Sequence, residues 1–247
     1  MANSGSLSSS TGLTSMHKAL IVILLIWFGV IPVGWYFEYH LGFSSNLVSN
    51  TSTVIQILGF LAILLVPWMK LPGQERLSNY ERLSQTVILW IFIALSPRLL
   101  WELPWLFFLD EIREGVENGA LWSYIWAGYL RGGDLRYLTG DTLVVVLEWI
   151  ALFVGVFEGW ALWRFFVQGK RFTNIQLSLI MAGMIVEVTL PAVYFGVEIA
   201  NNLENVVSPA DLWIKFILLN SFWCTMPLVT FFWGARRLAT QDLSVKF

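Results

Sequence analysis

Six apolar stretches, each long enough to cross a lipid bilayer as a helix, constrain this chain more than any other feature. About 20 consecutive apolar residues span the hydrocarbon layer. The stretches are Ala19–Tyr36, Val54–Met69, Thr86–Phe108, Thr142–Val167, Ile175–Ile199 and Leu212–Trp233. They predict an all-α fold: a polytopic membrane helix bundle with five to six transmembrane helices around a lipophilic cavity.

The polar segments predict one bundle with two tails. We expect a disordered N-terminal tail over residues 1–16, a transmembrane bundle over 17–238 with an extramembrane loop at 109–141, and a C-terminal tail over 239–247. The loop begins with acidic residues and continues with aromatic ones. Loops of this length are uncommon unless they are functional. We therefore expect this one to lie in the membrane interface or to fold back over the cavity.

The composition excludes several classes of protein. Only 13% of the 247 residues are charged, against about 25% in soluble domains, and 57% are hydrophobic. A net charge of −2 provides no basic surface for nucleic acid. The single cysteine, Cys224, cannot form a disulfide framework or a cysteine-based metal cluster. His17 and His40 lie outside the apolar stretches or at their edges, so we expect no metal site and no cofactor.

Lysine and arginine residues are distributed unequally between alternate segments. One set of segments holds Lys18, Lys70, Arg76, Arg82, Arg164, Lys170, Arg171, Arg236, Arg237 and Lys246. The other set holds only Arg113, Arg131 and Arg136. Because cytoplasmic segments of membrane proteins are rich in these residues, the pattern predicts a multi-pass protein with both termini in the cytoplasm. An odd number of spans would remove the asymmetry.

Ionisable residues inside the apolar stretches are candidates for a functional site, since each costs about 2.5–3.5 kcal/mol to insert. In the third stretch, Arg98, Trp101, Glu102 and Trp105 have the spacing of one helical face. The prolines Pro97 and Pro104 flank this group. The face could belong to a site, or Arg98 and Glu102 could simply neutralise each other.

The later stretches carry further candidates. Glu148 is followed on its own face by small residues and is placed to face an opening, or to pair with Arg98 or Lys215. Glu158 lies off that face and is interpreted as structural. The remaining candidates share faces on the fifth and sixth stretches: Glu187, Pro191, Tyr194 and Glu198, and then Asn220, Trp223 and Pro227. Lys215 is expected to extend toward the membrane surface.

These residue types predict acid–base chemistry on a lipophilic alkene. A carboxyl group surrounded by hydrocarbon can donate a proton, and a carboxylate held ionised by a guanidinium can accept one. Aromatic faces stabilise a developing cation. Double-bond migration in a sterol and cyclisation of a terpenoid both fit this chemistry.

Three motifs in register resemble the emopamil-binding protein family, the sterol delta-8/delta-7 isomerases. Gly133-Asp134-x-Arg136-Tyr137 precedes Glu148 by the family's interval. The segment from Arg98 to Trp105 occupies the place of the family's H-x-x-x-E-G-W. Asn220-Ser221-Phe222-Trp223, followed by Pro227, is similar to its N-x-x-W-x-x-x-P. The matches keep their order over Arg98–Pro227, about half of the chain.

The resemblance implies a five-helix membrane bundle around a sterol cavity, to which the first apolar stretch would be an addition. It implies that Glu102 and Glu148 are the catalytic carboxylates and that Trp223 stabilises the cation. It also implies a structural loop formed by Asp134, Arg136 and Tyr137. For a eukaryotic protein the membrane would be the endoplasmic reticulum, and for a bacterial one the inner membrane.

One departure from the family concerns the proton relay. The family's histidine is replaced by Arg98, which cannot shuttle a proton but can hold a carboxylate ionised. Either the relay is rebuilt from Glu187, or the substrate and the reaction have changed.

Three hypotheses follow. The first is a membrane isomerase of sterol-like or polycyclic isoprenoid substrates, the second an integral membrane terpene cyclase with the same acid and base residues, and the third a non-catalytic sterol- or lipid-binding membrane protein. The predicted catalytic residues are Glu102, Glu148 and Arg98. The predicted substrate-binding residues are Trp101, Trp105, Glu187, Tyr194, Asn220 and Trp223. The expected partners are a lipophilic small molecule and the bilayer, and a homodimer stays open.

Overall fold

All six apolar stretches fold into helices that are long and apolar enough to cross a membrane. The computed structural model describes residues 14–72 and 74–246. The six spans are α1 (Ser15–Tyr39), α2 (Ser45–Leu65) with the 3-10 turn η1 (Val66–Trp68), α3 (Asn79–Pro97) with the π-helix η2 (Arg98–Glu102) and α4 (Leu103–Phe107), α8 (Thr142–Val167), α9 (Asn174–Ala200), and α10 (Pro209–Asp211) with the π-helix η4 (Leu212–Leu219) and α11 (Ser221–Thr240). The predicted all-α polytopic membrane bundle is therefore confirmed.

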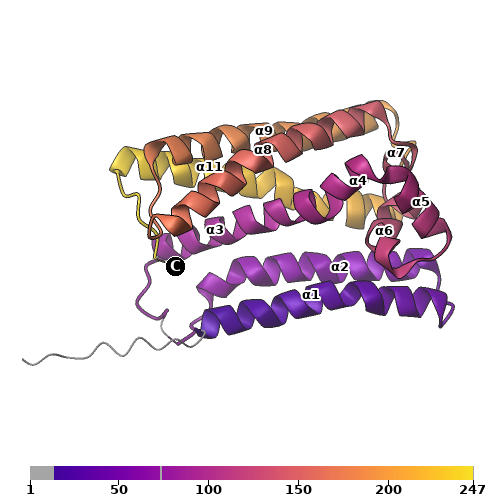
Figure 1. The fold of residues 1–247 in the computed structure, drawn as a ribbon, viewed down its shortest axis with the longest axis horizontal. Helices are drawn as coiled ribbons and strands as arrows, with labels where there is room; N and C mark the ends of the chain where they lie inside the picture. Colours follow the sequence, from indigo (N-terminus) through magenta and orange to yellow (C-terminus); the bar gives the residue numbers. More distant parts are fainter. Residues whose placement is uncertain (1–13, 73, 247) are drawn as a thin grey trace, which may run out of the picture.

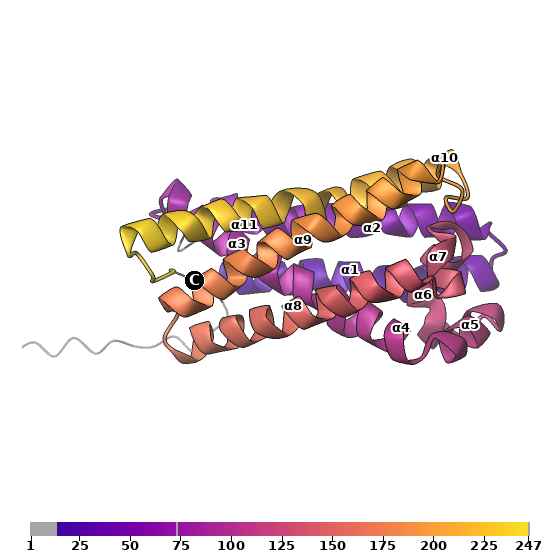
Figure 2. The ribbon, with the colours of Figure 1, turned by 90° about the horizontal axis from the view of Figure 1, so that it is seen from above.

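The long helices run nearly along one common axis (Figure 1). α1 packs on α2, and α9 packs on both α8 and α11. α3 runs between the α1–α2 pair and the α8–α9 pair (Figure 1), and Figure 2 shows α9 and α11 side by side from above. α1 begins and α11 ends at the same end of the bundle, as an even number of spans requires.

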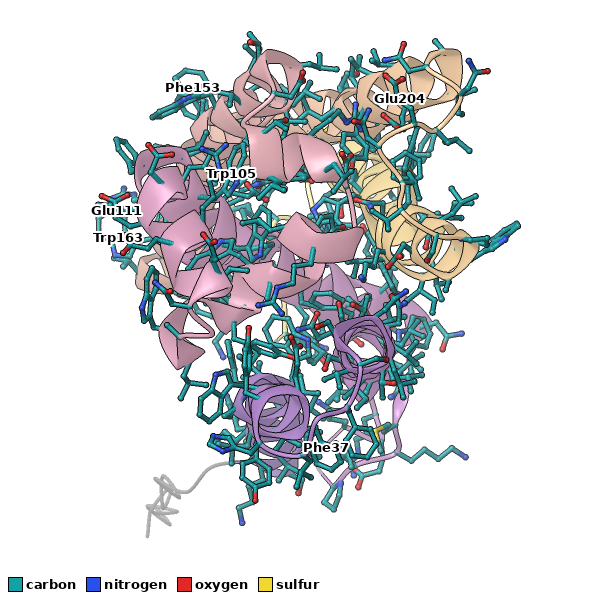
Figure 3. The ribbon with its side chains drawn as sticks, turned by 90° about the vertical axis from the view of Figure 1, so that its right-hand side faces the viewer. Phe37, Trp105, Glu111, Phe153, Trp163 and Glu204 are labelled. Carbon is teal, nitrogen blue, oxygen red and sulfur yellow. The ribbon has the colours of Figure 1, made fainter. Side chains whose placement is uncertain are left out.

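The outer surface of the bundle is apolar along the spans. Leu25, Phe153 and Phe232 are 69%, 65% and 68% exposed. In the end-on view of Figure 3, Phe37 and Phe153 point away from the bundle while Trp105 lies within it. Exposing large apolar side chains to water costs free energy, whereas exposing them to lipid tails does not. The chain is an integral multi-pass membrane protein.

α2 begins earlier than its apolar stretch, Val54–Met69, predicts. The helix starts at Ser45, where the Ser44 side chain accepts a hydrogen bond from the N–H of Leu47. Its first turns contain serine, threonine and asparagine, which lower the local hydropathy. These polar side chains lie partly on a cavity rather than on lipid, which explains why the apolar pattern missed them.

The two π-helices interrupt the spans next to functional candidates. In η2 the N–H of Leu103 bonds to the carbonyl of Arg98, five residues earlier. Pro97 and Pro104 have no N–H to donate to a regular α-helical ladder. A π-turn holds more residues than the 3.6 of an α-turn. The spacing of Arg98, Trp101, Glu102 and Trp105 along this span is therefore not that of a regular α-helix, and only the first three line the cavity.

The predicted extramembrane loop is a group of short helices at the end of the bundle opposite the termini (Figure 1). It contains α5 (Leu109–Glu117), the 3-10 turn η3 (Leu121–Ser123), α6 (Tyr124–Gly132) and α7 (Leu135–Thr139). Residues of α6 and α7 line the central cavity. The loop folds back over the cavity, as one of the two predictions has it.

Both predicted tails need correction where the structure describes them. Residues 1–13 of the N-terminal tail lie outside the described residues, but Ser15 and Met16 already belong to α1. At the other end, the segment after α11 packs back on the bundle. Phe172 donates its N–H to the carbonyl of Leu243 at 2.9 Å, and Val245 donates to Lys170 at 3.0 Å. Residues 242–246 thus form a strap across the terminal end of the bundle.

Candidate functional site

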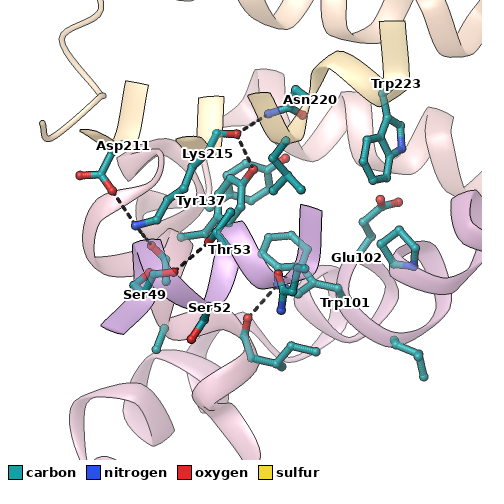
Figure 4. A pocket seen from close by; sticks show the side chains of 18 of the residues that line it. Ser49, Ser52, Thr53, Trp101, Glu102, Tyr137, Asp211, Lys215, Asn220 and Trp223 are labelled. Carbon is teal, nitrogen blue, oxygen red and sulfur yellow. Dashed lines mark hydrogen bonds and ion pairs between the residues drawn. The ribbon is translucent and has the colours of Figure 1, made fainter. Parts of the chain in front are cut away.

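A cavity of about 390 Å³ lies inside the bundle, within the range of about 300–1,000 Å³ typical of small-molecule sites. It is bounded by α1, α2, α3, η2, α6, α7, α8, α9 and the span of α10, η4 and α11. Figure 4 shows one part of it, where labelled side chains from α2, η2, α7 and the span of α10, η4 and α11 converge on a common space.

The structure brings most of the predicted site residues together at this cavity. Those that line it are Arg98, Trp101, Glu102, Tyr137, Glu148, Glu187, Tyr194, Asn220 and Trp223. Trp105 does not line it: its indole is fully buried and donates to the backbone carbonyl of Tyr137 at 3.1 Å. Trp105 stacks behind Trp101, with ring centroids 6.4 Å apart and planes inclined by 14°. Its position supports the wall of the cavity and not a substrate contact.

Glu102 and Glu148 face each other across the cavity from different spans. Glu102 ends η2, and Glu148 lies in the second turn of α8. The two side chains line the same cavity and lie close enough to share a hydrogen bond when one of them is protonated. The Oε2 atom of Glu102 is buried and has no hydrogen-bond partner in the described part of the chain. The two carboxyl groups therefore form a pair with at least one oxygen free for a ligand or a proton.

Tyr137 connects the loop to this pair. Its hydroxyl donates a hydrogen bond to Oε1 of Glu148. Burial raises the pKa of Tyr137 well above its usual value, and the neighbouring Glu148 carboxylate raises it further. The phenol therefore remains a protonated donor. The sequence interpretation of Tyr137 as purely structural missed this contact, although the fixed interval between Tyr137 and Glu148 was the available signal.

Arg98 pairs with neither Glu102 nor Glu148 among the described residues. Its guanidinium donates to Glu158 at 2.6 Å and also to Glu187. All three side chains are at most 2% exposed, and they join η2, α8 and α9. The alternative of an ion pair between Arg98 and Glu102 is wrong. Glu158 joins α8 to this triad.

The triad is compact because two glycines let the helices approach. A Cβ on Gly155 would lie 2.7 Å from Cδ of Arg98, and one on Gly183 would lie 2.8 Å from Oε1 of Glu158. Real Cβ atoms do not approach other atoms so closely. Small residues at these two positions thus let the arginine and the glutamates pack between the spans.

Indole rings form a large part of the apolar wall. Trp101 donates its N–H to the carbonyl of Ile125 at 3.3 Å, which fixes its ring at the cavity. Trp223 lies edge-on to Trp90 and Phe60, with centroid distances of 5.5 and 5.8 Å. Figure 4 shows Trp223 beside Glu102. The carboxyl pair is therefore bordered by aromatic faces, which favour a cation.

The loop residues Asp134 and Arg136 belong to a second buried network behind the cavity. The Asp134 carboxylate accepts from Arg136 Nη2 at 2.6 Å and from the Tyr194 hydroxyl. The guanidinium of Arg136 lies 4.4 Å from the Tyr194 ring centroid and 3.4 Å from a Glu198 oxygen. Asp134 and Arg136 do not line the cavity. They hold α7 and thereby the position of Tyr137.

Sequence reasoning missed a polar wall on the opposite side of the cavity. α2 contributes Ser49, Ser52, Thr53 and Gln56, which recur with helical spacing in the N-terminal half of the helix. That spacing was the signal. Lys215 was expected to extend toward the membrane surface, but it is 1% exposed and pairs with Asp211 at 2.6 Å. Its position inside η4 directs the ammonium into the bundle.

Comparison with known proteins does not assign the chain to a family. No protein-family model matches the chain, and no curated protein matches it. In the part of the chain that the structure describes, no group of three or more histidine, cysteine or acidic residues is placed to hold a metal ion. The functional argument therefore rests on the cavity itself.

Proposed function

We propose that this protein is a membrane-embedded isomerase that moves a carbon–carbon double bond in a sterol-like or polycyclic isoprenoid substrate. The observation that carries the proposal is the pair formed by Glu102 and Glu148 in an indole-bordered cavity within the membrane spans. Neither carboxyl forms an ion pair with a basic side chain of the described residues. Two neighbouring carboxyl groups in a poorly solvated site share a proton rather than both ionise. The site thus offers one acid and one base.

The two groups have different surroundings, which assigns their roles. Glu148 accepts the hydrogen bond of Tyr137, and a donated hydrogen bond stabilises the ionised form of a carboxyl. Glu102 has a buried oxygen without a hydrogen-bond partner among the described residues. We therefore assign Glu102 as the proton donor and Glu148 as the base.

The reaction balances with these two groups alone. Glu102 transfers its proton to one carbon of the substrate double bond, which leaves a carbocation on the other carbon and a carboxylate on Glu102. Glu148 then removes a proton from a carbon next to the cation, and the electron pair of that C–H bond forms the new double bond. The proton on Glu148 returns to Glu102, since the two carboxyls face each other. Trp101 and Trp223 stabilise the cation without attacking it.

The resemblance to the emopamil-binding protein family supports this proposal. Glu102, Glu148 and Trp223 occupy the positions of the family's catalytic residues and border one cavity. Arg98 occupies the position of the family's histidine but is paired with Glu158 and Glu187. We infer that Arg98 positions the spans and takes no part in proton transfer.

Purified protein tests the proposal directly. We expect it to convert a zymosterol-type delta-8 sterol to a double-bond isomer, detected by mass spectrometry and NMR. Glu102→Gln and Glu148→Gln should each lower turnover by about 10²–10⁴-fold, the usual contribution of a general acid or base. Glu111→Gln is the control, because Glu111 is exposed at the edge of the molecule on α5 (Figure 3) and does not line the cavity.

Other outcomes decide between the remaining functions. Unchanged turnover in both cavity variants would refute the carboxylate mechanism. Cyclisation of a linear prenyl epoxide, without sterol isomerisation, would identify a terpene cyclase. Tight sterol binding without any turnover would identify a lipid-binding protein.

We also propose that the terminal end of the bundle faces the cytoplasm, in the endoplasmic reticulum of a eukaryote or the inner membrane of a bacterium. The excess of lysine and arginine near that end supports this orientation. In a Cys224→Ser background, Gly169→Cys should be labelled by a membrane-impermeant maleimide only after the membrane is opened, and Glu117→Cys should be labelled before. The reverse result would invert the topology.

A further inference from the structure

The cavity has two chemically different ends. Figure 4 shows Glu102 and Trp223 on one side, and Ser49, Lys215 and Asp211 on the other. The second end includes the polar wall of α2 and belongs to the same cavity. An isomerase that acts only on hydrocarbon has no use for such a wall.

Lys215 is the central group of this second end. Its side chain is 2% exposed, and two of its three N–H groups have acceptors: Asp211 at 2.6 Å and the carbonyl of Gly128 at 3.1 Å. No further acceptor for the third N–H occurs among the residues that the structure describes. Since an ammonium carries three donors, Lys215 retains one for a ligand that lies in the cavity.

The serine and glutamine side chains provide further hydrogen-bonding groups. The hydroxyl of Ser49 is buried and has no partner within the described ranges. Ser52 and Gln56 line the cavity on the same face of α2. Buried polar groups in native proteins are generally paired. A free hydroxyl at a cavity wall therefore indicates that a ligand supplies its hydrogen-bond partner.

The charges at this end cancel, which restricts the ligand. Lys215 is balanced by Asp211, and Arg131 is balanced by Glu38. Glu38 also accepts hydrogen bonds from Ser45 at 2.7 Å and Tyr124 at 2.9 Å. An additional carboxylate, phosphate or ammonium would bring an unbalanced charge into a desolvated site. A neutral group with an oxygen atom satisfies the donors without that penalty.

We propose that the wall formed by Ser49, Ser52, Gln56 and Lys215 binds an uncharged oxygen function, a hydroxyl or a ketone, at one end of the lipophilic ligand. The inference rests on the proposed function and extends it to the substrate class: an oxygenated polycycle with its alkene remote from the oxygen. Hydrogen bonds at this wall orient the ring system and determine which carbon atoms reach Glu102 and Glu148.

Equilibrium binding of two matched sterols tests the proposal. The full-length Glu102→Gln protein in nanodiscs, in which turnover is suppressed, is titrated with zymosterol and with its 3-deoxy counterpart, each competing with a tritiated sterol. We expect the hydroxyl-bearing sterol to bind about tenfold more tightly, the effect of one or two hydrogen bonds. The added changes Ser49→Ala, Ser52→Ala and Gln56→Leu should reduce this preference to less than about twofold.

Two further proteins control the measurement. Thr51→Ala should keep the tenfold preference, because Thr51 is exposed on the same helix and does not line the cavity. If the triple variant does not purify as a monodisperse protein, Lys215→Met combined with Asp211→Leu removes the donor together with its counter-charge. This pair of changes should also abolish the preference.

The outcomes separate this inference from the proposed function. Equal binding of both sterols, or a preference that survives in both sets of variants, overturns the oxygen subsite, even if the wild-type protein isomerises sterols. A preference that the variants abolish supports the subsite, even if the wild-type protein shows no turnover. Absence of binding by either sterol overturns both proposals.

Discussion

A single hydroxyl from the loop gives the two carboxyl groups of the cavity different properties. Tyr137 donates to Glu148 and leaves Glu102 without such a partner. The sequence identified both glutamates from their positions within apolar stretches, because a charge in lipid is costly wherever it is not used. It could not identify the role of Tyr137, because the contact depends on how α7 is placed over α8.

Tyr137→Phe should lower turnover by about 10- to 100-fold, since a hydrogen bond to a charged group contributes about 1.5–3 kcal/mol. The raised pKa of Tyr137 keeps its proton in place up to the ordinary value of about 10, so the wild-type protein should not lose this donor below that pH. Turnover of a delta-8 sterol between pH 6 and 10 checks both statements. Tyr36→Phe, on the exposed face of α1, is the matched control. A variant as active as the wild type would remove Tyr137 from the mechanism.

At the scale of elements, the ion triad joins three spans. Arg98→Met leaves Glu158 and Glu187 buried without their cation, and breaking a buried pair costs about 3–5 kcal/mol. We expect a large loss of thermal stability in detergent. Adding Glu158→Gln and Glu187→Gln should restore most of it, because no charge is then left unpaired. If the single and the triple variant both unfold at the temperature of the wild type, the triad does not stabilise the bundle.

Two glycines of α9 provide a second test at this scale. Gly183→Ala would place a methyl group 2.8 Å from Glu158 and 3.0 Å from Val154, so we expect a loss of about 1–3 kcal/mol from overpacking. Gly196→Ala meets nothing within 4 Å on the same helix and should be neutral or slightly stabilising. Thermal unfolding of the two variants makes the comparison. Equal effects would show that close packing at Gly183 is unimportant.

The elements also show where sequence reasoning ends. The range of α8, Thr142–Val167, follows directly from its apolar stretch, which Asp141 caps. The π-turn η2 in the third span did not follow, because the pattern assumed a regular helix throughout. The polar wall of α2 was missed for a related reason. A helix that is polar toward a cavity and apolar toward lipid has a mean hydropathy below that of a typical span.

At the scale of the whole molecule, the even number of spans places the C-terminal strap beside the ends of α3 and α9. Arg237 is 1% exposed and donates to the carbonyls of Asp242 and Ser244 at 2.7 and 2.5 Å. Gln85 of α3 donates to the carbonyl of Lys246 at 2.8 Å. The sequence predicts a C-terminal tail over residues 239–247. Long-range backbone pairing of this kind has no local pattern, so the sequence could not predict it.

Truncation after Gln241 tests the strap. It removes the acceptors of a buried guanidinium, so we expect a loss of about 2–4 kcal/mol in the free energy of unfolding. Melting of the truncated and full-length proteins in the same detergent measures this loss. Lys246→Ala is the control: it removes only an exposed charge, and such pairs contribute about 0–1 kcal/mol. A truncated protein as stable as the intact one would show that the strap does not stabilise the bundle.

Because Glu102 and Glu148 lie close together, a proton removed in one turnover is carried over to the next. The hydrogen atom taken from one substrate molecule stays within the pair and is the one given to the next molecule. In heavy water, the first product molecules should therefore contain ordinary hydrogen at the newly protonated carbon, and deuterium should enter only as the pair exchanges with solvent. The isotope content of successive products would then measure how well the bundle keeps water away from its two acids.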